Sequence, residues 1–239
     1  MKREILEQLQ VDRAEKRPVV LATFLKTGEQ RLLYLVGKKG LKDLDPRIGE
    51  AARAALIEDK PRTVETEQGP LFLNVFNPPL RLILVGAVHI AQALVPMAQL
   101  AGYEVIVIDP RSAFGSIERF PGVQLSNDWP DEAMAQLKPD LRTALVTLTH
   151  DPKIDDPALI SGLKSDVFYI GALGSKKTHA SRLERLTAAG FGPDDFARIH
   201  GPVGLSIGAK SPAEISIAIL AQMTAALRQP AAPANSAAA

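Results

Sequence analysis

One stretch of this chain constrains the fold more than any other: residues 80–111 have the pattern of a strand, a tight turn, a helix and a second strand. An apolar run ends at Gly86, apolar residues then recur at helical spacing as far as Gly102, and a β-branched strand ends at Asp109. This order predicts the opening βαβ unit of a nucleotide-binding sheet. The dinucleotide pattern G-x-G-x-x-A would require glycine where the chain has Val88.

The alternation of strands and helices continues to residue 228. Strands are predicted at 81–85, 104–108, 143–148 and 166–170, with weaker ones near 123–125 and 198–200. Helices are predicted at 89–101, 130–137, 157–164, 176–188 and 212–228, the third of them capped by Asp156. This alternation predicts an α/β fold with a parallel Rossmann-like sheet and helices on both faces.

The first 78 residues follow a different pattern and predict a smaller α+β domain. We expect a helix at 2–15, strand pairs at 19–25 with 31–36 and at 63–66 with 71–76, and a helix at 46–58 capped by Asp45. The segment Asn77-Pro78-Pro79 stops strand pairing, so it separates a domain at 1–78 from one at 79–228. The Ala/Pro-rich residues 229–239 predict a disordered tail.

Composition narrows the classes of function. The net charge of +1 gives no indication of a nucleic-acid partner. The chain has no cysteine, which excludes disulfides, thiolate metal sites and cysteine nucleophiles. The N-terminus does not have the pattern of a signal peptide, and no apolar run approaches the roughly 20 residues that span a membrane. We therefore expect a cytoplasmic protein with no membrane span.

The turn from Gly86 to His89 is the first candidate site. A helix N-terminus attracts anions, and His89 could donate a hydrogen bond to one there. Val88, however, would place its methyl groups where a pyrophosphate touches glycine in dinucleotide-binding turns. Asp109 follows Gly86 by about 20 residues, where a carboxylate normally accepts from ribose hydroxyls, and an Asp-Pro turn is the alternative explanation. The unit therefore predicts either an anion site or a plain strand-to-helix turn.

Polar residues also follow the strand predicted at 143–148. His150 and Asp151 come directly after it, at the edge where open parallel sheets bind ligands. A turn alone would explain Asp151 before Pro152, but it would not call for His150. The pattern favours a functional role here.

The segment from Gly171 to Thr178 has the features of an anion-binding turn. Gly171 and Gly174 allow close approach of the backbone, and Ser175 caps a helix that begins with Lys176. Unpaired N–H groups, the helix dipole and ammonium groups together favour a phosphate or a pterin phosphate. The spacing is not that of a P-loop, and an ordinary capped helix with solvated lysines is the alternative.

A glycine-rich loop follows the last predicted strand and runs from His200 to Lys210. It contains Gly201, Gly204 and Gly208, which allow the backbone to approach a ligand. Apolar residues lie between the glycines and predict a packed loop.

Three of the four histidines, His89, His150 and His200, fall at predicted carboxyl ends of strands. Such ends share one edge of a parallel sheet, so their convergence indicates a site. The sequence does not name the chemistry, because no spacing specifies metal ligands and no Ser-His-Asp order or catalytic carboxylate pair stands out. The catalytic residues, if any, are not assigned.

Over most of residues 81–228 the chain resembles the C-terminal domain of the xanthine dehydrogenase accessory (XdhC/CoxI) family. The motifs that carry this resemblance occur in order: Leu-Thr-His-Asp-Pro-Lys at 148–153, Asp-Asp-Pro-Ala-Leu at 155–159, Tyr-Ile-Gly-Ala-Leu-Gly-Ser at 169–175, Thr-His at 178–179, Arg-Ile-His-Gly-Pro-Val-Gly-Leu at 198–205 and Ile-Gly-Ala-Lys-Ser-Pro-Ala-Glu-Ile at 207–215. A series of motifs in the same order is more specific to a family than a single glycine pattern.

The resemblance implies a cofactor-binding chaperone without turnover of its own. Family members bind the molybdenum cofactor, support its sulfuration and hand it to a molybdenum hydroxylase such as xanthine or carbon monoxide dehydrogenase. The implied cargo is molybdopterin or its dinucleotide form, and the implied partners are the client hydroxylase and a cysteine desulfurase. The strand pairs of the first domain also suggest a homodimer. With the patterns above, the candidate cofactor-binding residues are Gly86, His89, Asp109, His150, Asp151, Gly171, Gly174, Ser175, Lys176, Thr178, His200, Gly201, Gly204, Gly208 and Lys210.

Two departures from the family keep other functions open. Relatives usually have glycine at the position of Val88, and many carry a Gly-Gly-Cys motif where this chain has residues 36–40 without cysteine. One alternative is an NAD(P)-dependent oxidoreductase that uses His150 as acid or base. The other is a paralogue that binds no cofactor and only scaffolds a hydroxylase complex.

Overall fold

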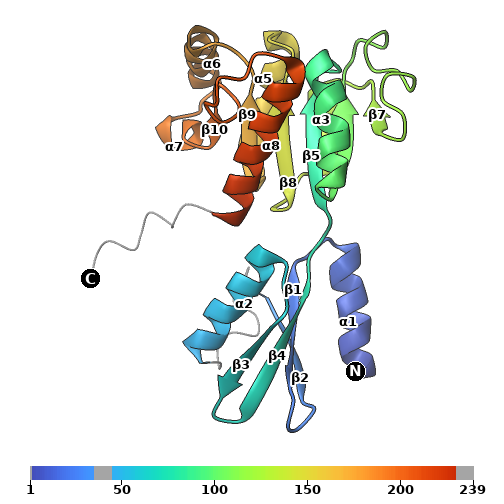
Figure 1. The fold of residues 1–239 in the computed structure, drawn as a ribbon, viewed down its shortest axis with the longest axis vertical. Helices are drawn as coiled ribbons and strands as arrows, with labels where there is room; N and C mark the ends of the chain where they lie inside the picture. Colours follow the sequence, from blue (N-terminus) through green and yellow to red (C-terminus); the bar gives the residue numbers. More distant parts are fainter. Residues whose placement is uncertain (1, 35–44, 230–239) are drawn as a thin grey trace. The chain divides into compact units, whose positions relative to one another are not determined.

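The computed structural model describes residues 2–34 and 45–229, and these divide into two compact units, Met1–Pro78 and Pro79–Ala239. Figure 1 shows the elements of each unit. The predicted tail, apart from Gln229, and the region around residues 36–40 lie outside the described residues. Among the described residues, no helix has both the length and the apolar character needed to cross a membrane.

The first unit is a four-stranded antiparallel sheet in the order β2-β1-β4-β3. Its elements are α1 (Arg3–Ala14), β1 (Val19–Phe24), β2 (Gln30–Leu33), α2 (Pro46–Glu58), β3 (Arg62–Thr66) and β4 (Gly69–Phe76). The two predicted strand pairs form one sheet because β1 also pairs with β4. Asp45 caps α2 as predicted, since its side chain accepts from the backbone N–H of Arg47.

The second unit is a six-stranded, wholly parallel sheet in the order β7-β6-β5-β8-β9-β10. Its strands are β5 (Leu80–Val85), β6 (Tyr103–Ile108), β7 (Gln124–Ser126), β8 (Thr143–Thr147), β9 (Tyr169–Ala172) and β10 (Ile199–His200). Its helices are α3 (His89–Leu100), α4 (Pro130–Leu137), α5 (Pro152–Leu163), α6 (Lys176–Ala188), α7 (Pro193–Phe196) and α8 (Pro212–Arg228). Numbered from β5, this is the 3-2-1-4-5-6 strand order of dinucleotide-binding folds.

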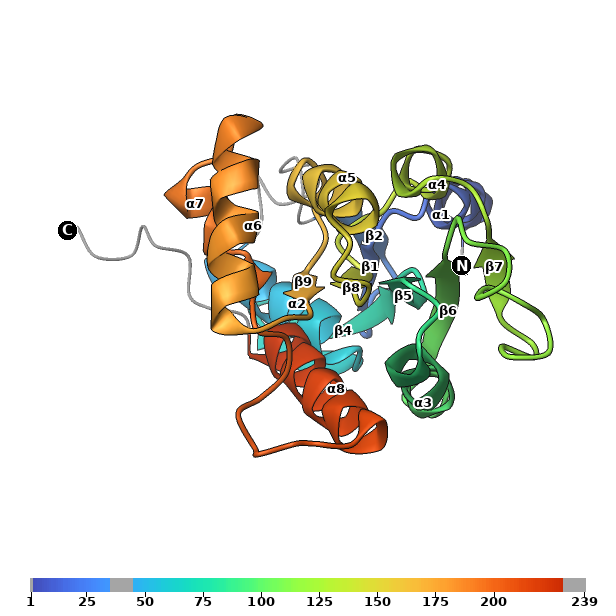
Figure 2. The same cartoon turned by 90° about the horizontal axis from the view of Figure 1, so that it is seen from above.

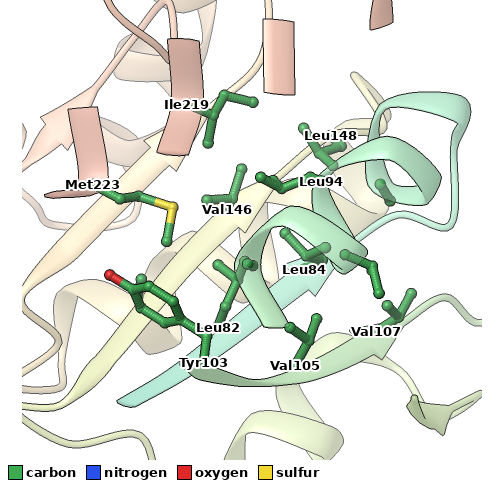
Figure 3. Packing of buried hydrophobic residues seen from close by; sticks show 14 of the residues in the cluster. Leu82, Leu84, Leu94, Tyr103, Val105, Val107, Val146, Leu148, Ile219 and Met223 are labelled. Atoms are coloured by element: carbon green, nitrogen blue, oxygen red, sulfur yellow. The ribbon is translucent and has the colours of Figure 1, made fainter. Parts of the chain in front are cut away.

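Two apolar layers hold this sheet between its helices. Helices α3 and α8 lie side by side on one face, and α4 and α5 cover the other (Figure 2). The strand residues alternate accordingly: Leu82 and Leu84 pack toward α3 and α8, whereas Ile83 and Val85 pack toward α5. Figure 3 shows the first layer, where Leu94 and other helix residues pack on the strands. This two-sided burial explains why the strand sequences are continuously apolar.

The predicted α/β architecture is confirmed, and the differences at α5, β9 and α7 are larger than those at other elements. Helix α5 begins at Pro152, five residues earlier than predicted, because Asp151 rather than Asp156 caps it. Strand β9 covers 169–172 instead of 166–170, because its pairing with β8 runs from Tyr169 to Ala172. The short helix α7 was not predicted; it follows the N-cap residue Gly192.

Candidate functional site

The sheet reverses its direction of growth between β5 and β8, so the carboxyl ends of these strands form a topological switch point. The segment that follows β5 is in contact with the segment that follows β8. Gly86 has φ of +111°, and a Cβ there would lie 2.5 Å from Cγ2 of Thr149 and 3.3 Å from its backbone nitrogen. Glycine is therefore required at position 86 both for its backbone angle and for this close approach.

At the turn between β5 and α3, the carboxylate of Asp109 is fully buried and engaged by the protein itself. It accepts from the N–H of Ala87 at 2.8 Å, from the N–H of Arg111 at 3.0 Å, and from the Arg111 guanidinium at 2.8 Å on each oxygen. Burial acts to raise the pKa of Asp109, but the hydrogen bonds from Arg111 and Ala87 outweigh it and hold the pKa below its ordinary value. The geometry thus gives Asp109 the turn-holding role that the sequence left open as an alternative to ribose binding.

His89 is the first residue of α3 and is exposed. Val88 precedes it as N-cap and offers no side-chain hydrogen bond to the helix. The Arg111 guanidinium at this turn is already paired with Asp109.

The loop between β8 and α5 is built around a buried carboxylate that sequence reasoning did not select. Asp155 is 1% exposed and accepts from Oγ1 and N of Thr149 and from the N–H of His150. Burial raises the pKa of Asp155, opposed by the Thr149 hydrogen bond and the charge of Arg182. Asp151 caps α5 by accepting from the N–H of Lys153 at 3.0 Å. His150 itself is exposed and has φ of +66°.

The turn between β9 and α6 combines the features expected of an anion site. Ser175 caps α6, accepting the N–H of Thr178 on its side chain and the N–H of His179 on its carbonyl. The backbone N–H groups of Lys176 and Lys177 have no acceptor within the described part of the chain, and both side chains are exposed. Two unpaired amides, a helix dipole and two ammonium groups therefore meet at one turn.

His150 lies against this same turn. Gly174 has φ of +142°, and a Cβ there would lie 3.0 Å from Cγ2 of Thr178 and 3.6 Å from Nδ1 of His150. The structure thus brings His150 and the β9–α6 turn together, although they are separated in sequence. An imidazole and an anion-binding turn side by side can contact two parts of one ligand.

The segment after β10 packs against β9 and α8. The His200 ring stacks on Tyr169 with centroids 4.7 Å apart, and the Tyr169 hydroxyl donates to Gln222, which also accepts from the N–H of Gly204. Burial lowers the pKa of His200. A Cβ at Gly201 would lie 2.1 Å from Nδ1 of His179, so this glycine admits the histidine ring.

Some predicted site residues have packing or capping contacts. Gly171 is buried, and a Cβ there would lie 2.5 Å from Cγ2 of Val203. Gly208 and Lys210 are exposed; the N–H of Lys210 donates to Glu214 in the capping box of α8. Within the described ranges, no group of three or more His, Asp or Glu residues is arranged to hold a metal ion.

Two further residues near the site, His179 and Arg182, were not selected from the sequence as site residues. Arg182 is 1% exposed, lies 3.6 Å from Asp155 and donates to the carbonyl of Leu173 at 2.8 Å. Its Nε and Nη1 atoms and Nδ1 of His179 have no hydrogen-bond partner among the residues that the structure describes. Burial, and then the charge of Arg182, lowers the pKa of His179. The sequence could have indicated that Arg182 is buried, because it lies one helical turn before the apolar Leu186, on the inner face of α6.

Comparisons with known proteins agree with this architecture. The model of the XdhC Rossmann domain family matches residues 82–223. The chain is 33% identical over 180 residues to a Bacillus subtilis protein named as a probable component of xanthine dehydrogenase, covering 71% of this chain and 52% of that protein. It is 30% identical over 148 residues to the molybdenum cofactor insertion chaperone PaoD of Escherichia coli, covering 62% of this chain and 40% of that protein. The chain thus spans about half or less of the length of these relatives.

A solved structure supports the same assignment. The crystal structure of a xanthine dehydrogenase from Bacillus halodurans superposes with a TM-score of 0.67 at 25% identity, covering 95% of this chain and 67% of the other. The family model covers more than half of the chain, including most of the parallel sheet. The chain therefore belongs to the XdhC Rossmann domain family.

Proposed function

We propose that this protein binds the molybdenum cofactor as cargo in the cytoplasm and delivers it to a molybdenum hydroxylase of the xanthine dehydrogenase or carbon monoxide dehydrogenase type. Family membership and the similarity to a protein named as a molybdenum cofactor insertion chaperone support this role. The role is one of binding and transfer, without turnover of the cargo.

The observation that carries the proposal is the β9–α6 turn. Molybdopterin ends in a phosphate, and the unpaired amides of Lys176 and Lys177 with their ammonium groups suit that group. His150 lies next to the same turn, and we propose that it donates to the pterin part of the cargo. The cargo would thus lie along the carboxyl edge of the sheet, from the switch point toward α6.

Further partners follow from the family resemblance. A cysteine desulfurase would supply sulfur to the bound cofactor, and the client hydroxylase would accept it. A homodimer is part of the same proposal. Because the chain spans 52% and 40% of the two curated relatives, contacts that those proteins make through their remaining length are not assigned to this chain.

An NAD(P)-dependent oxidoreductase is the competing function, favoured by the 3-2-1-4-5-6 strand order. Two observations at the β5–α3 turn count against it. Both oxygens of Asp109 are engaged by Ala87 and Arg111, and Val88 stands where the nucleotide-binding turn has glycine. The carboxylate that would accept from ribose is therefore already paired.

Titration of the purified chain distinguishes these functions. Molybdenum cofactor released from a purified hydroxylase is added in one series and NADH in another, and binding is followed by absorbance and fluorescence. We expect saturable binding of the molybdenum cofactor and none of NADH. Saturable NADH binding alone would favour the oxidoreductase, and binding of neither would favour a scaffold.

A further inference from the structure

One buried pair of charges joins the two loops that form the candidate site. Asp155 belongs to α5 and Arg182 to α6, and their side chains are each only 2% exposed with Nη2 and Oδ2 3.6 Å apart. Asp155 holds the β8–α5 loop through Thr149 and His150. Arg182 holds the β9–α6 turn by donating to the carbonyl of Leu173, the residue before Gly174.

The backbone of His150 needs such support. Four non-glycine residues within the described ranges have positive φ, and three of them, Lys16, Asp59 and Lys138, lie at the ends of helices, where the left-handed conformation is common. His150 instead precedes a helix, with φ of +66°. A left-handed non-glycine residue persists only where its surroundings hold it. The hydrogen bond from the His150 N–H to Oδ2 of Asp155, at 3.1 Å, supplies that hold.

Stability alone does not explain this pair. A buried ion pair loses hydration from both charges, and an apolar pair of similar volume is often as stabilising. Arg182 also keeps two nitrogens without partners in the described part of the chain, and burial lowers its pKa. A second ion pair already joins the same helices near the surface, where Arg185 contacts Asp156 at 2.5 and 3.0 Å.

We propose that Asp155 and Arg182 are positioning residues, which fix His150 in its left-handed conformation against the β9–α6 turn. The imidazole and the amides of that turn then face one ligand in a preset geometry. Asp155 acts through His150, and Arg182 acts through Asp155 and Leu173; neither touches the ligand. The choice of ligand rests on the proposed function, whereas the positioning itself does not.

The positioning is tested on the full chain without ligand. NMR measures the hydrogen exchange of the His150 amide and its three-bond coupling to the α proton, which reports φ. In Asp155→Asn and in the double variant Asp155→Leu/Arg182→Met we expect exchange at His150 to rise about tenfold and the coupling to change. The amide of Val146, inside β8, serves as reference and should not change. Wild-type exchange and coupling at His150 in either folded variant would overturn the proposal.

The consequence for binding is tested with molybdenum cofactor released from a purified hydroxylase. The double variant should raise the Kd about tenfold, as expected when groups that position a ligand-binding residue are lost. The matched control is Asp156→Leu/Arg185→Met, which removes the surface pair between the same helices and should leave Kd unchanged. An equal loss in both double variants would overturn the positioning role. If the wild-type chain binds no cofactor, the proposed function fails, and the exchange measurement still decides the positioning.

Discussion

Two turns at the same sheet edge share a strand–turn–helix pattern but have opposite chemistry. At the β5–α3 turn, a buried carboxylate fills the space beside the backbone and pairs with Ala87 and Arg111. At the β9–α6 turn, Ser175 satisfies two amides, and those of Lys176 and Lys177 are left without acceptors among the described residues. We call the first turn closed because the paired carboxylate of Asp109 lies beside it, and the second open because its unpaired N–H groups belong to two exposed lysines.

A glycine pattern alone therefore does not locate an anion site. Both turns contain a glycine with positive φ, Gly86 at +111° and Gly174 at +142°. What separates them is the charge beside each turn: the carboxylate of Asp109 paired with Arg111 at the first, and the side chains of Lys176 and Lys177 at the second.

Gly86→Ala should produce the largest loss of stability. Its Cβ would meet Thr149 at 2.5 Å in a backbone conformation that disfavours alanine, and we expect a cost of about 3 kcal/mol. Gly102→Ala is the control in the same unit, because Gly102 also has positive φ but no atom within 4 Å of the added Cβ. Gly102→Ala should lower the free energy of unfolding, measured in urea, by about 1 kcal/mol. Equal costs would show that the turns after β5 and β8 do not touch.

Asp109→Asn should open the closed turn at a cost of about 2 kcal/mol, because the buried side chain loses charge-assisted hydrogen bonds from Arg111. Urea unfolding of the two chains gives the difference. The same variant should not bind NADH, because the side chain at position 109 contacts the turn both as an amide and as a carboxylate. NADH binding by the wild-type chain would contradict this assignment.

Lys176→Ala with Lys177→Ala should weaken binding at the open turn. We expect the Kd for the molybdenum cofactor to rise about tenfold, because two ammonium groups near a phosphate are lost. Lys138→Asn with Lys164→Ala removes the same charge from the C-terminal ends of α4 and α5 and should leave the Kd unchanged. A parallel loss in both variants would mean that only overall charge matters.

His200 should give the smallest effect, a pH dependence of stability. Its pKa in the folded chain lies below its ordinary value of 6.5 because of burial. As the pH falls, the unfolded chain binds the proton first, so stability present above pH 6.5 is lost toward lower pH. His200→Gln should therefore lose less stability than the wild type as the pH is lowered through this range. Identical slopes in urea unfolding would show that His200 is not the titrating group.

The sequence predicted the parallel sheet well because its strands are buried on both faces and read as continuous apolar runs, such as Leu82–Val85. It misplaced the start of α5, because two Asp-Pro pairs, at 151 and 156, offer equivalent capping signals. Only the structure shows that Asp151 is the cap and that Asp155 holds the preceding loop.

The candidate site was predictable where local chemistry defines it. Ser175 and Lys176 follow a strand and open a helix, which one sequence window reveals. Long-range contacts gave a weaker signal. The sequence predicted that His150 and Gly174 follow strands at the same sheet edge, but it did not indicate their contact or that of Arg182 with Asp155. Asp109 had two local explanations, and only the structure shows its contacts with Ala87 and Arg111.

We expect the open turn, and not the closed one, to hold the cargo. Amide hydrogen exchange of the full chain, with and without saturating molybdenum cofactor, distinguishes the two turns. We predict slower exchange at the N–H groups of Lys176 and Lys177, with no change at Val88 and His89. Protection of Val88 and His89 with unchanged exchange at Lys176 and Lys177 would contradict the account.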